Sequence, residues 1–414
     1  MMEDIAAYVG IDWASATHYA YALDAHGAKL GHRSFRHSGE GLAELAGWVQ
    51  QTTGAEPGRI AIGIEVPHGP VVESLMDSGF LVYALNPKQL DRFRDRFTIA
   101  GAKDDRLDAF VLADALRTDR RFYRFLEPVH PTIIQLREWS RMTEDLSAER
   151  NRLANRFRHQ LWRYFPQMLE LAEDWSKQWI LDLWDLIPTP ARARTVRAST
   201  IERHLKESRV KRWTADTLLT HLRSTPISVA AGVTEACVAH CQLILGRLRL
   251  VMHQMKQAMK ELERLCSAVA ELPSATGIAP QADPQILRSM PGIGTIVLAA
   301  LLSEGRDAIV HRDAQALRGL SGVAPVTRRS GKQMVVVMRQ SCPHRLRTAV
   351  YHWARVAVLH DFQTRNRYAA LRKRGHSHAR ALRSIGSRLI GVACAMLRTG
   401  ELFDNNRIPQ SAAA

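Results

Sequence analysis

Residues Ala6–Asp12 read A-A-Y-V-G-I-D, an apolar and β-prone run that ends in a carboxylate. Two more short strands are predicted at Tyr19–Leu23 and Lys29–Phe35, and the turn sequence D-A-H-G at residues 24–27 lies between them. This order predicts an antiparallel meander of three strands. Because a charge at the end of a buried strand is unfavourable without a partner, Asp12 is the first candidate functional residue.

Helices and strands alternate after the meander. Ser38 is a suitable N-cap for a predicted helix at Gly41–Gln50. The remaining predicted elements are a strand at Arg59–Val66, a helix at Val71–Met76, a strand at Phe80–Leu85 and a helix at Asp104–Arg117. Three hairpin strands followed by alternating helices and strands are the plan of a ribonuclease-H-like α/β domain, which we assign to residues 1–125.

The segment Gly101–Asp108, G-A-K-D-D-R-L-D, has three carboxylates within five residues. In a helix, Asp108 shares a face with Asp105, three residues before it, and with Asp104, four residues before it. Carboxylate pairs suit Mg²⁺, which binds one or two carboxylates and completes its shell with water and phosphate. For the segment alone, a solvated acidic helix start is the simpler interpretation, because Asp favours the first turn of a helix.

Acids on other elements favour the metal interpretation. Asp12 ends the first strand, and Glu65 ends a later strand that we expect to be its neighbour. Ligand sites of open α/β sheets lie at one edge, so these two acids and those of residues 101–108 could meet there. Ahead of a basic remainder of the chain, this set is consistent with a two-metal phosphoryl-transfer site.

The charge of the chain points to a polyanionic partner. A net charge of +16 and a pI near 10.1 accompany an otherwise ordinary composition of 46% hydrophobic and 24% charged residues. Such a balance favours nucleic acid over a membrane surface. Residues Arg365–Arg388 contain eight Lys or Arg and no acid, and Arg192–Arg212 is a second basic tract. Either tract could also be a solvated face without a partner.

Cysteine usage and hydropathy suggest a cytoplasmic protein with no membrane association. The five cysteines are scattered and include no C-x-x-C pair, so neither a disulfide framework nor a zinc ribbon is supported. No signal peptide is recognisable at the N-terminus. The longest apolar run, Ile296–Leu302, is far too short to span a bilayer.

The middle of the chain, residues 126–279, is predicted to be helical. Gln135–Phe165 reads as one long helix, and between Val238 and Val269 apolar residues recur in alternating steps of three and four. This spacing predicts a coiled coil, with a globular helical bundle as the alternative. The segment at about 167–233 is inserted between the two helices, and its tryptophans (Trp175, Trp179 and Trp184) favour a small core over a base-stacking platform.

The C-terminal part, residues 280–414, is predicted to be mostly helical and contains a turn that resembles the helix-hairpin-helix motif. Residues 289–294 read S-M-P-G-I-G and precede an apolar helical stretch. In that motif, Gly292 and Gly294 would let backbone N–H groups approach a phosphate, and the next helix would present its positive N-terminus. An ordinary turn between helices is the alternative.

A serine in this part is surrounded by cations. Ser330 lies between Arg329 and Gly331, close to Arg328 and Lys332. Cations could attract a phosphodiester and stabilise charge in its transition state. A serine nucleophile must also be activated, and no His, Asp or Glu lies within ten residues on either side. From the residues alone, Ser330 is most simply a turn residue.

The acids and K-D-D-R-L-D at residues 103–108 resemble the DEDD transposases of bacterial insertion sequences. This is insertion-sequence family one hundred and ten, which includes the pilin-gene-inverting recombinases, and its first domain is similar to the RuvC resolvase. The family places its acids three apart, which favours Asp105 over Asp104. The resemblance implies Mg²⁺ (or Mn²⁺) and the catalytic metal ligands Asp12, Glu65, Asp105 and Asp108.

The same resemblance implies a nucleophilic serine in the C-terminal domain. The segment at residues 319–325, G-L-S-G-V-A-P, resembles the family segment that precedes this serine. Ser330 is therefore the implied nucleophile, and Ser321 is the fallback. The family further implies a DNA transposase or site-specific recombinase, a non-coding guide RNA and a homo-oligomer, either a dimer or a tetramer.

Three other functions compete with this interpretation. The first is a RuvC-like metal-dependent nuclease or junction resolvase without a covalent serine step, and the second is a non-enzymatic nucleic-acid-binding scaffold. Sugar kinases also open with G-I-D and a hairpin, but we find no second Gly-rich nucleotide motif. For a nucleic-acid enzyme acting at the nucleoid, the expected contact residues are Lys103, Arg106, Gly292, Gly294, Arg328, Arg329, Lys332, Arg372, Lys373 and Arg374.

Overall fold

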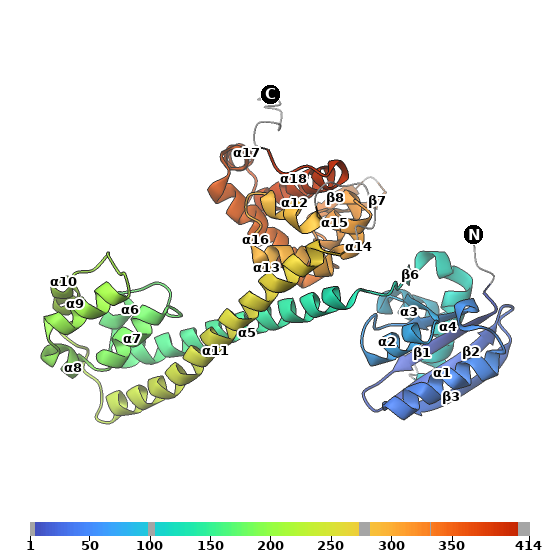
Figure 1. The fold of residues 1–414 in the computed structure, drawn as a ribbon, viewed down its shortest axis with the longest axis horizontal. Helices are drawn as coiled ribbons and strands as arrows, with labels where there is room; N and C mark the ends of the chain where they lie inside the picture. The colour runs from blue at the N-terminus through green and yellow to red at the C-terminus, as the bar shows by residue number, and fades with distance from the viewer. Residues whose placement is uncertain (1–4, 98–103, 273–281, 332, 405–414) are drawn as a thin grey trace. The chain divides into compact units, whose positions relative to one another are not determined.

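A computed structural model describes residues 5–97, 104–272, 282–331 and 333–404. The chain forms two compact units, Met1–Val129 and His130–Ala414 (Figure 1). The predicted contact residues Lys103 and Lys332 lie outside the described residues. The further division of the second unit at residue 280 stays a prediction.

The first unit is built on a mixed sheet whose six described strands follow the order β3-β2-β1-β4-β5-β6. β1 pairs antiparallel with β2, and β2 with β3, which confirms the predicted meander. β1 and β4 run parallel, as do β4 and β5, while β6 closes the far edge antiparallel. The bounds are β1 Ala7–Trp13, β2 Thr17–Asp24, β3 Lys29–Arg36, β4 Ile60–Ile64, β5 Leu81–Ala84 and β6 Arg124–Phe125.

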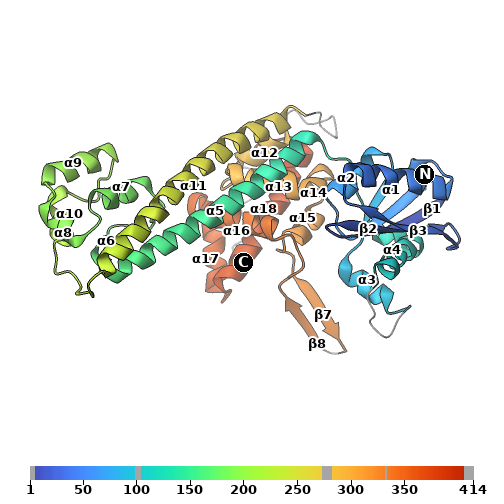
Figure 2. The same cartoon turned by 90° about the horizontal axis from the view of Figure 1, so that it is seen from below.

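Helices cover both faces of this sheet (Figure 2). α1 (Gly39–Thr53) and α2 (Pro70–Asp77) bury aliphatic residues against one face, and α3 (Pro87–Arg94) and α4 (Asp105–Asp119) cover the other. Ser38 caps α1 as predicted, because its hydroxyl accepts a hydrogen bond from the Gly41 N–H. The result is a helix–sheet–helix sandwich, consistent with a ribonuclease-H-like transposase domain.

Two long helices, α5 (Pro131–Tyr164) and α11 (Val233–Ala270), pack side by side in the second unit (Figure 1). α5 begins four residues before the predicted start at Gln135. Pro131 occupies its first turn, where its missing N–H would have no partner in any case, and His130 accepts a hydrogen bond from the Thr132 N–H.

The buried face of α11 is wider than the predicted row of apolar residues, which recur in alternating steps of three and four from Val238. Four residues outside this row, spaced seven apart, are also buried: Ile244, Val251, Ala258 and Leu265. The helix packs against α5 and also against α12 and α13, so more than two heptad positions face neighbours. The helical pair lies within one chain, and the coiled coil stays a prediction.

A small helical insert connects α5 to α11. Trp175 and Trp184 are fully buried in its core, and Trp179 packs against it, which confirms the structural interpretation of the three tryptophans. The Trp184 indole N–H donates to the Tyr164 hydroxyl, which itself donates to the Pro188 carbonyl. The insert contains α6 Pro166–Leu169, α7 Gln178–Leu186, α8 Pro190–Thr195, α9 Ala198–Glu207 and α10 Ala215–Leu222.

The C-terminal part is mostly helical, as predicted, but contains one β-hairpin. The hairpin consists of β7 (Val326–Ser330) and β8 (Gln333–Val337), which pair only with each other (Figure 2). The helices are α12 Asp283–Ser289, α13 Thr295–Glu304, α14 Arg306–Val310, α15 Ala314–Leu320, α16 His344–His360, α17 Phe362–Lys373 and α18 His378–Thr399.

All five cysteines are free thiols, and four of them are buried. Within the described part of the chain, no helix is both long and apolar enough to cross a bilayer.

Candidate active site

Two glycines allow α4 to lie directly on the sheet. A Cβ atom added to Gly10 in β1 would lie 2.0 Å from the Ala109 carbonyl oxygen, and one added to Gly63 would lie 3.2 Å from the Leu112 carbonyl oxygen. Gly10 and Gly63 are paired across β1 and β4, so they face α4 together. The backbone of α4 therefore rests where ordinary side chains would stand.

The direction of α4 follows from two further contacts. Arg117, in the last turn of α4, lies against Gly27, in the turn beside the start of β1. Phe110, near the N-terminal end of α4, packs edge-on against Tyr21 of β2. α4 thus runs antiparallel to β1, and its first turn lies toward the carboxyl ends of β1 and β4.

This arrangement bears on where Asp12 and Glu65 lie relative to the start of α4. Asp12 follows Gly10 by two residues within β1, so it belongs to the same face of the sheet as Gly10. Glu65 is the first residue after β4, two residues beyond Gly63. Both are half-buried. The first turn of α4, with its acids, begins at the same end of the sheet. That the four acids form one site stays a prediction.

The three neighbouring acids of residues 104–108 have different roles. Asp104 is the N-cap of α4, because its carboxylate accepts a hydrogen bond from the Arg106 N–H. Asp105 is exposed, whereas Asp108 is only 6% exposed. The structure thus gives Asp104 a capping role and leaves Asp105 and Asp108 as the pair in the first turn.

Arg94 of α3 is an unpredicted neighbour of the acids. Its Nη2 lies 2.8 Å from Asp108 Oδ1. The geometry of this contact makes no hydrogen bond, so among the described residues Asp108 Oδ1 and Arg94 Nε are buried polar atoms without a hydrogen-bond partner. The two residues belong to different helices, and no sequence pattern predicts their pairing.

The donor chemistry of this edge fits a hard divalent cation. The four carboxylates offer only oxygen ligands. Asp108 Oδ1 is buried and has no hydrogen-bond partner among the described residues, so a metal ion could bind it. In the described residues, no three Asp, Glu, His or Cys side chains lie close enough together to hold a metal ion. Arg94 provides the positive charge beside Asp108 instead.

Ser330 lies at the exposed end of β7, where it pairs with Gln333 of β8. Arg328 and Arg329 are also exposed. Among the described residues, no hydrogen bond to Ser330 Oγ is formed, so the hairpin offers the hydroxyl to solvent without an adjacent base. The next residue, Gly331, has a φ of 54°, which explains glycine at this turn.

Ser321, the fallback nucleophile, has a structural role. It is 0% exposed, and its hydroxyl donates to the Leu317 carbonyl at 2.7 Å near the end of α15. A buried hydroxyl that caps a helix cannot approach a DNA phosphate without unfolding that turn. The geometry therefore favours Ser330 over Ser321.

Arg347 of α16 anchors the base of the hairpin. Its Nη2 donates to the backbone carbonyls of Arg339 and Gln340, at 3.2 and 2.7 Å, and its Nε donates to Cys342 Sγ. Gly322 packs closely against this point, because an added Cβ would lie 2.6 Å from Cys342 Sγ. The hairpin is thus held at its base and exposed at its tip.

The turn at residues 289–294 connects α12 to α13, and packing explains its first glycine. Gly292 has a φ of 89°, and an added Cβ would lie 2.8 Å from backbone atoms of Trp353 and Ala357 in α16. At the start of α13, the Thr295 hydroxyl donates to Glu263, whose carboxylate also pairs with Arg288. These contacts hold the pKa of Glu263 at about 2, chiefly through the Arg288 hydrogen bond.

An acid therefore already lies beside the positive N-terminus of α13. Gly294 is exposed and open to solvent. Phosphate binding at Gly292 and Gly294 stays a prediction. The remaining predicted contact residues, Arg106 at the start of α4 and Arg372, Lys373 and Arg374 at the end of α17, are exposed.

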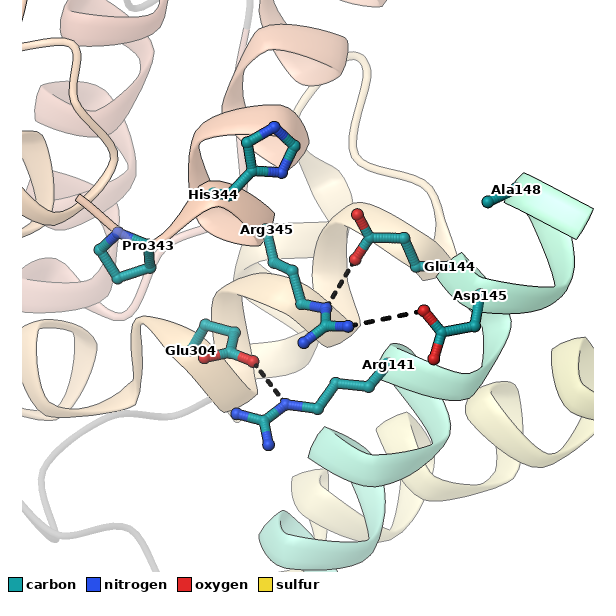
Figure 3. Close-up of a pocket in the computed structure, with 8 residues that line it drawn as sticks. All are labelled: Arg141, Glu144, Asp145, Ala148, Glu304, Pro343, His344 and Arg345. Atoms are coloured by element: carbon teal, nitrogen blue, oxygen red, sulfur yellow. Dashed lines mark hydrogen bonds and ion pairs between the residues drawn. The ribbon is translucent and has the colours of Figure 1, made fainter. Parts of the chain in front are cut away.

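A cavity of about 430 Å³ lies between α5, the end of α13 and the start of α16 (Figure 3). Arg345 forms ion pairs with Glu144 and Asp145 of α5, at 2.6 and 3.8 Å, and Arg141 pairs with Glu304 at 3.2 Å. None of the predicted site residues lines this cavity. Its ion pairs fasten α16, the helix that follows the hairpin, to α5.

Two family models match the chain in the regions that carry these features. Residues 9–166 match the model of DEDD transposases of the IS110 type. Residues 284–369 match the model described as transposase of the IS116/IS110/IS902 family.

A full-length relative supports the same assignment. The mini-circle putative transposase for IS117 from Streptomyces coelicolor is 30% identical over 98% of both chains. The chain belongs to the IS110 family of transposases. Transposases are enzymes that cut and rejoin DNA, and the DEDD group suggests that its members use divalent metal.

Other IS110-family relatives differ in how much of the chain they cover. The putative transposase y4uE of Sinorhizobium fredii is 59% identical over 209 residues, which is 50% of this chain and 58% of that protein. An uncharacterized 44.8 kDa protein of insertion element IS116 from Streptomyces clavuligerus is 29% identical over 96% of both chains.

Proposed function

We propose that this IS110-family transposase moves or inverts a DNA element by cutting and rejoining DNA with the acids of its first unit and Ser330 of its second. Support for the proposal comes from the packing of α4 on Gly10 and Gly63, because Asp12 and Glu65 follow these glycines by two residues, toward the end of the sheet at which α4 begins. An exposed serine between cations, in the part of the chain that matches the second transposase model, adds the nucleophile.

Asp12, Glu65, Asp105 and Asp108 are the proposed ligands of Mg²⁺. When bound, such an ion supplies positive charge for the phosphate oxygens and lowers the pKa of a coordinated hydroxyl. The four acids would hold the ion, and without an ion their negative charges would repel a DNA phosphate. Asp108 must exchange its contact with Arg94 for this role.

Ser330 supplies the covalent step. Its Oγ forms an ester bond to phosphorus, and the bond between phosphorus and one deoxyribose oxygen breaks. The hydroxyl proton leaves Oγ, and the departing sugar oxygen takes up a proton. Rejoining reverses the exchange with a second DNA hydroxyl, so the phosphodiester energy is conserved in the protein–DNA ester. Arg328 and Arg329 stabilise the negative charge of the transition state.

A non-coding guide RNA and a homo-oligomer are further parts of the proposal. The net charge of +16 is suited to binding both DNA and RNA, as well as DNA alone. Because the substrate is chromosomal DNA, we place the protein in the cytoplasm at the nucleoid.

The decisive experiment traps the covalent intermediate. Wild-type protein incubated with a nicked DNA that carries an element end and Mg²⁺ is expected to form a protein–DNA adduct on a denaturing gel. Ser330→Ala is expected to form no adduct while still binding the DNA. Ser321→Ala is the matched control and should retain the adduct, because Ser321 is buried.

The opposite result would favour a different enzyme. If Ser330→Ala cuts and rejoins DNA as well as wild type, the serine step is wrong. Hydrolysis by the acids alone, as in a RuvC-like nuclease or junction resolvase, would then be the better function.

A further inference from the structure

The outer strands of the sheet carry a row of polar and aromatic side chains that begins at Asp12. Across the antiparallel strands, Asp12 pairs with Tyr19, and Tyr19 pairs with Ser34. In the next row, Tyr21 pairs with His32. Cross-strand partners share a face, and Tyr21 contacts Phe110, so both rows lie on the face that α4 partly covers.

These side chains form one connected cluster. The His32 ring stacks on both Tyr19 and Tyr21, with centroid distances of 5.8 and 5.6 Å. The Tyr19 hydroxyl and His32 Nδ1 are hydrogen-bonded at 2.6 Å. Lys29 Nζ lies 5.9 Å from the centre of the Tyr21 ring. All three rings are half-buried, so the cluster is held in place yet reachable from solvent.

The cations of this cluster are hardly paired with acids among the described residues, although Asp12 begins the same row. Partial burial, and then the Lys29 and Arg106 cations, lower the pKa of His32. In the described residues, Lys29 forms no ion pair, and Arg106 has only a 4.0 Å contact with Asp104. The opposite face of β3 differs, because there Arg33 is paired with Glu44 of α1 and lies over Phe35.

The cluster lies close enough to the acids to contact the same nucleic-acid strand. β3 lies two strand spacings from β1, which is about 10 Å. A few nucleotides of one DNA strand can span this gap. A strand whose scissile phosphate lies at Asp12 would therefore place nearby phosphates over β2 and β3.

We propose that Tyr19, Tyr21, Lys29, His32 and Arg106 form a binding surface, the β2–β3 track, for the backbone of the DNA strand that is cut at the acids. Lys29 and Arg106 neutralise phosphates, and the hydroxyls of the two tyrosines and the free His32 nitrogen offer hydrogen bonds. The inference rests on the proposed function, because it takes its direction from a scissile phosphate at Asp12.

Adjacent residues of β3 provide a matched test of the track. Ser34 lies on the track face and Arg33 on the opposite face. The photoreactive amino acid p-benzoylphenylalanine is placed at either position of the full-length protein, which is then irradiated with labelled single-stranded DNA in the presence of a chelator. We expect the probe at Ser34 to crosslink at least about five times more DNA than the probe at Arg33.

Salt dependence gives a second, independent measurement. Each phosphate contact on a single strand contributes about 0.7 to the slope of log affinity against log salt. The double variant Lys29→Ala, Arg106→Ala should lower this slope by about 1.4. Arg33→Ala, which removes a charge from the same strand on the other face, should leave the slope unchanged. Thermal melting of each variant verifies that it is folded.

Two outcomes would overturn the track. Equal crosslinking from both positions, or equal slopes for both variants, would mean that only net charge attracts DNA. Crosslinking to RNA in preference to DNA, when both are offered, would assign the surface to RNA instead. These measurements need no cleavage, so a failure of the serine mechanism in the adduct experiment would be seen separately.

Discussion

The acid edge of the first unit and the Ser330 hairpin of the second unit are built by opposite means. At the acid edge, Gly10 lets the backbone of α4 contact the sheet, and Asp108 is buried beside Arg94. On the hairpin, Ser330 and both neighbouring arginines are exposed, and β7 pairs only with β8. A two-stranded hairpin has little stability of its own in water, so its order comes from the Arg347 anchor at its base.

This difference separates what each region contributes. A rigid edge with carboxylates on three elements can hold charge in fixed positions, which a metal and a phosphate both require. An exposed serine can reach a large substrate, but it has few protein groups around it that could position or activate that substrate. We therefore expect substitutions at the acid edge to affect both stability and chemistry, and substitutions at the hairpin tip to affect stability much less.

The largest expected effect tests whether the acid edge is catalytic. Asp108→Asn keeps the shape of the side chain and removes its charge, so strand transfer should fall by about a hundred- to a thousand-fold. Asp104→Asn is the matched control four residues away, and it should stay within a few-fold of wild type because Asn caps helices as well as Asp. Strand transfer on element-end DNA measures both. Equal losses would show that the segment acts only through its summed charge.

The second prediction tests the packing difference directly. Gly10→Ala would place a Cβ 2.0 Å from the Ala109 carbonyl oxygen, so we expect a loss of about 3 kcal/mol or more in the free energy of unfolding. Gly331→Ala on the hairpin meets no atom within 4 Å and strains only its positive φ, which costs about 1 kcal/mol. Urea unfolding monitored by circular dichroism compares them, and similar losses would contradict the distinction.

The third prediction concerns the cation beside Asp108. Arg94→Ala leaves a buried carboxylate unpaired, which should lower the free energy of unfolding by about 2 kcal/mol. Addition of Mg²⁺ should then raise the melting temperature of Arg94→Ala more than that of wild type, because the ion replaces the missing charge. Arg92→Ala, an exposed position on the same helix, is the control. No difference in the response to Mg²⁺ would mean that Asp108 binds no ion.

The smallest expected effect concerns an exposed pair in the second unit. Arg288 and Thr295 lower the pKa of Glu263 from 4.5 to about 2, so the pair stabilises the folded state above the ordinary Glu pKa and loses this contribution as the pH falls toward 2. Because both side chains are more than 40% exposed, the effect should stay below about 1 kcal/mol. The melting temperatures of wild type and Glu263→Gln should converge as the pH falls from about 5 to about 2. A constant difference over this range would contradict the linkage.

The sequence by itself determined most of the local elements and supplied the candidate acids. Alternating apolar residues predicted the meander, the caps Ser38 and Asp104 marked helix starts, and family resemblance selected Asp105. These features depend on neighbours within a few residues, which is why they can be read from a linear pattern. The predicted start of α5 at Gln135 is four residues too late, because the prediction does not take Pro131 as the first helical residue.

Only the tertiary structure decided which distant groups meet. The pairing of Arg94 with Asp108, the contact of Gly292 with α16 and the burial of Ser321 join residues whose sequence separation carries no periodic signal. The β2–β3 track appears for the same reason, since strand register and the path of α4 together decide which side chains share its face. Burial and pairing depend on how helices and strands pack against one another. That packing leaves no local pattern in the amino-acid sequence.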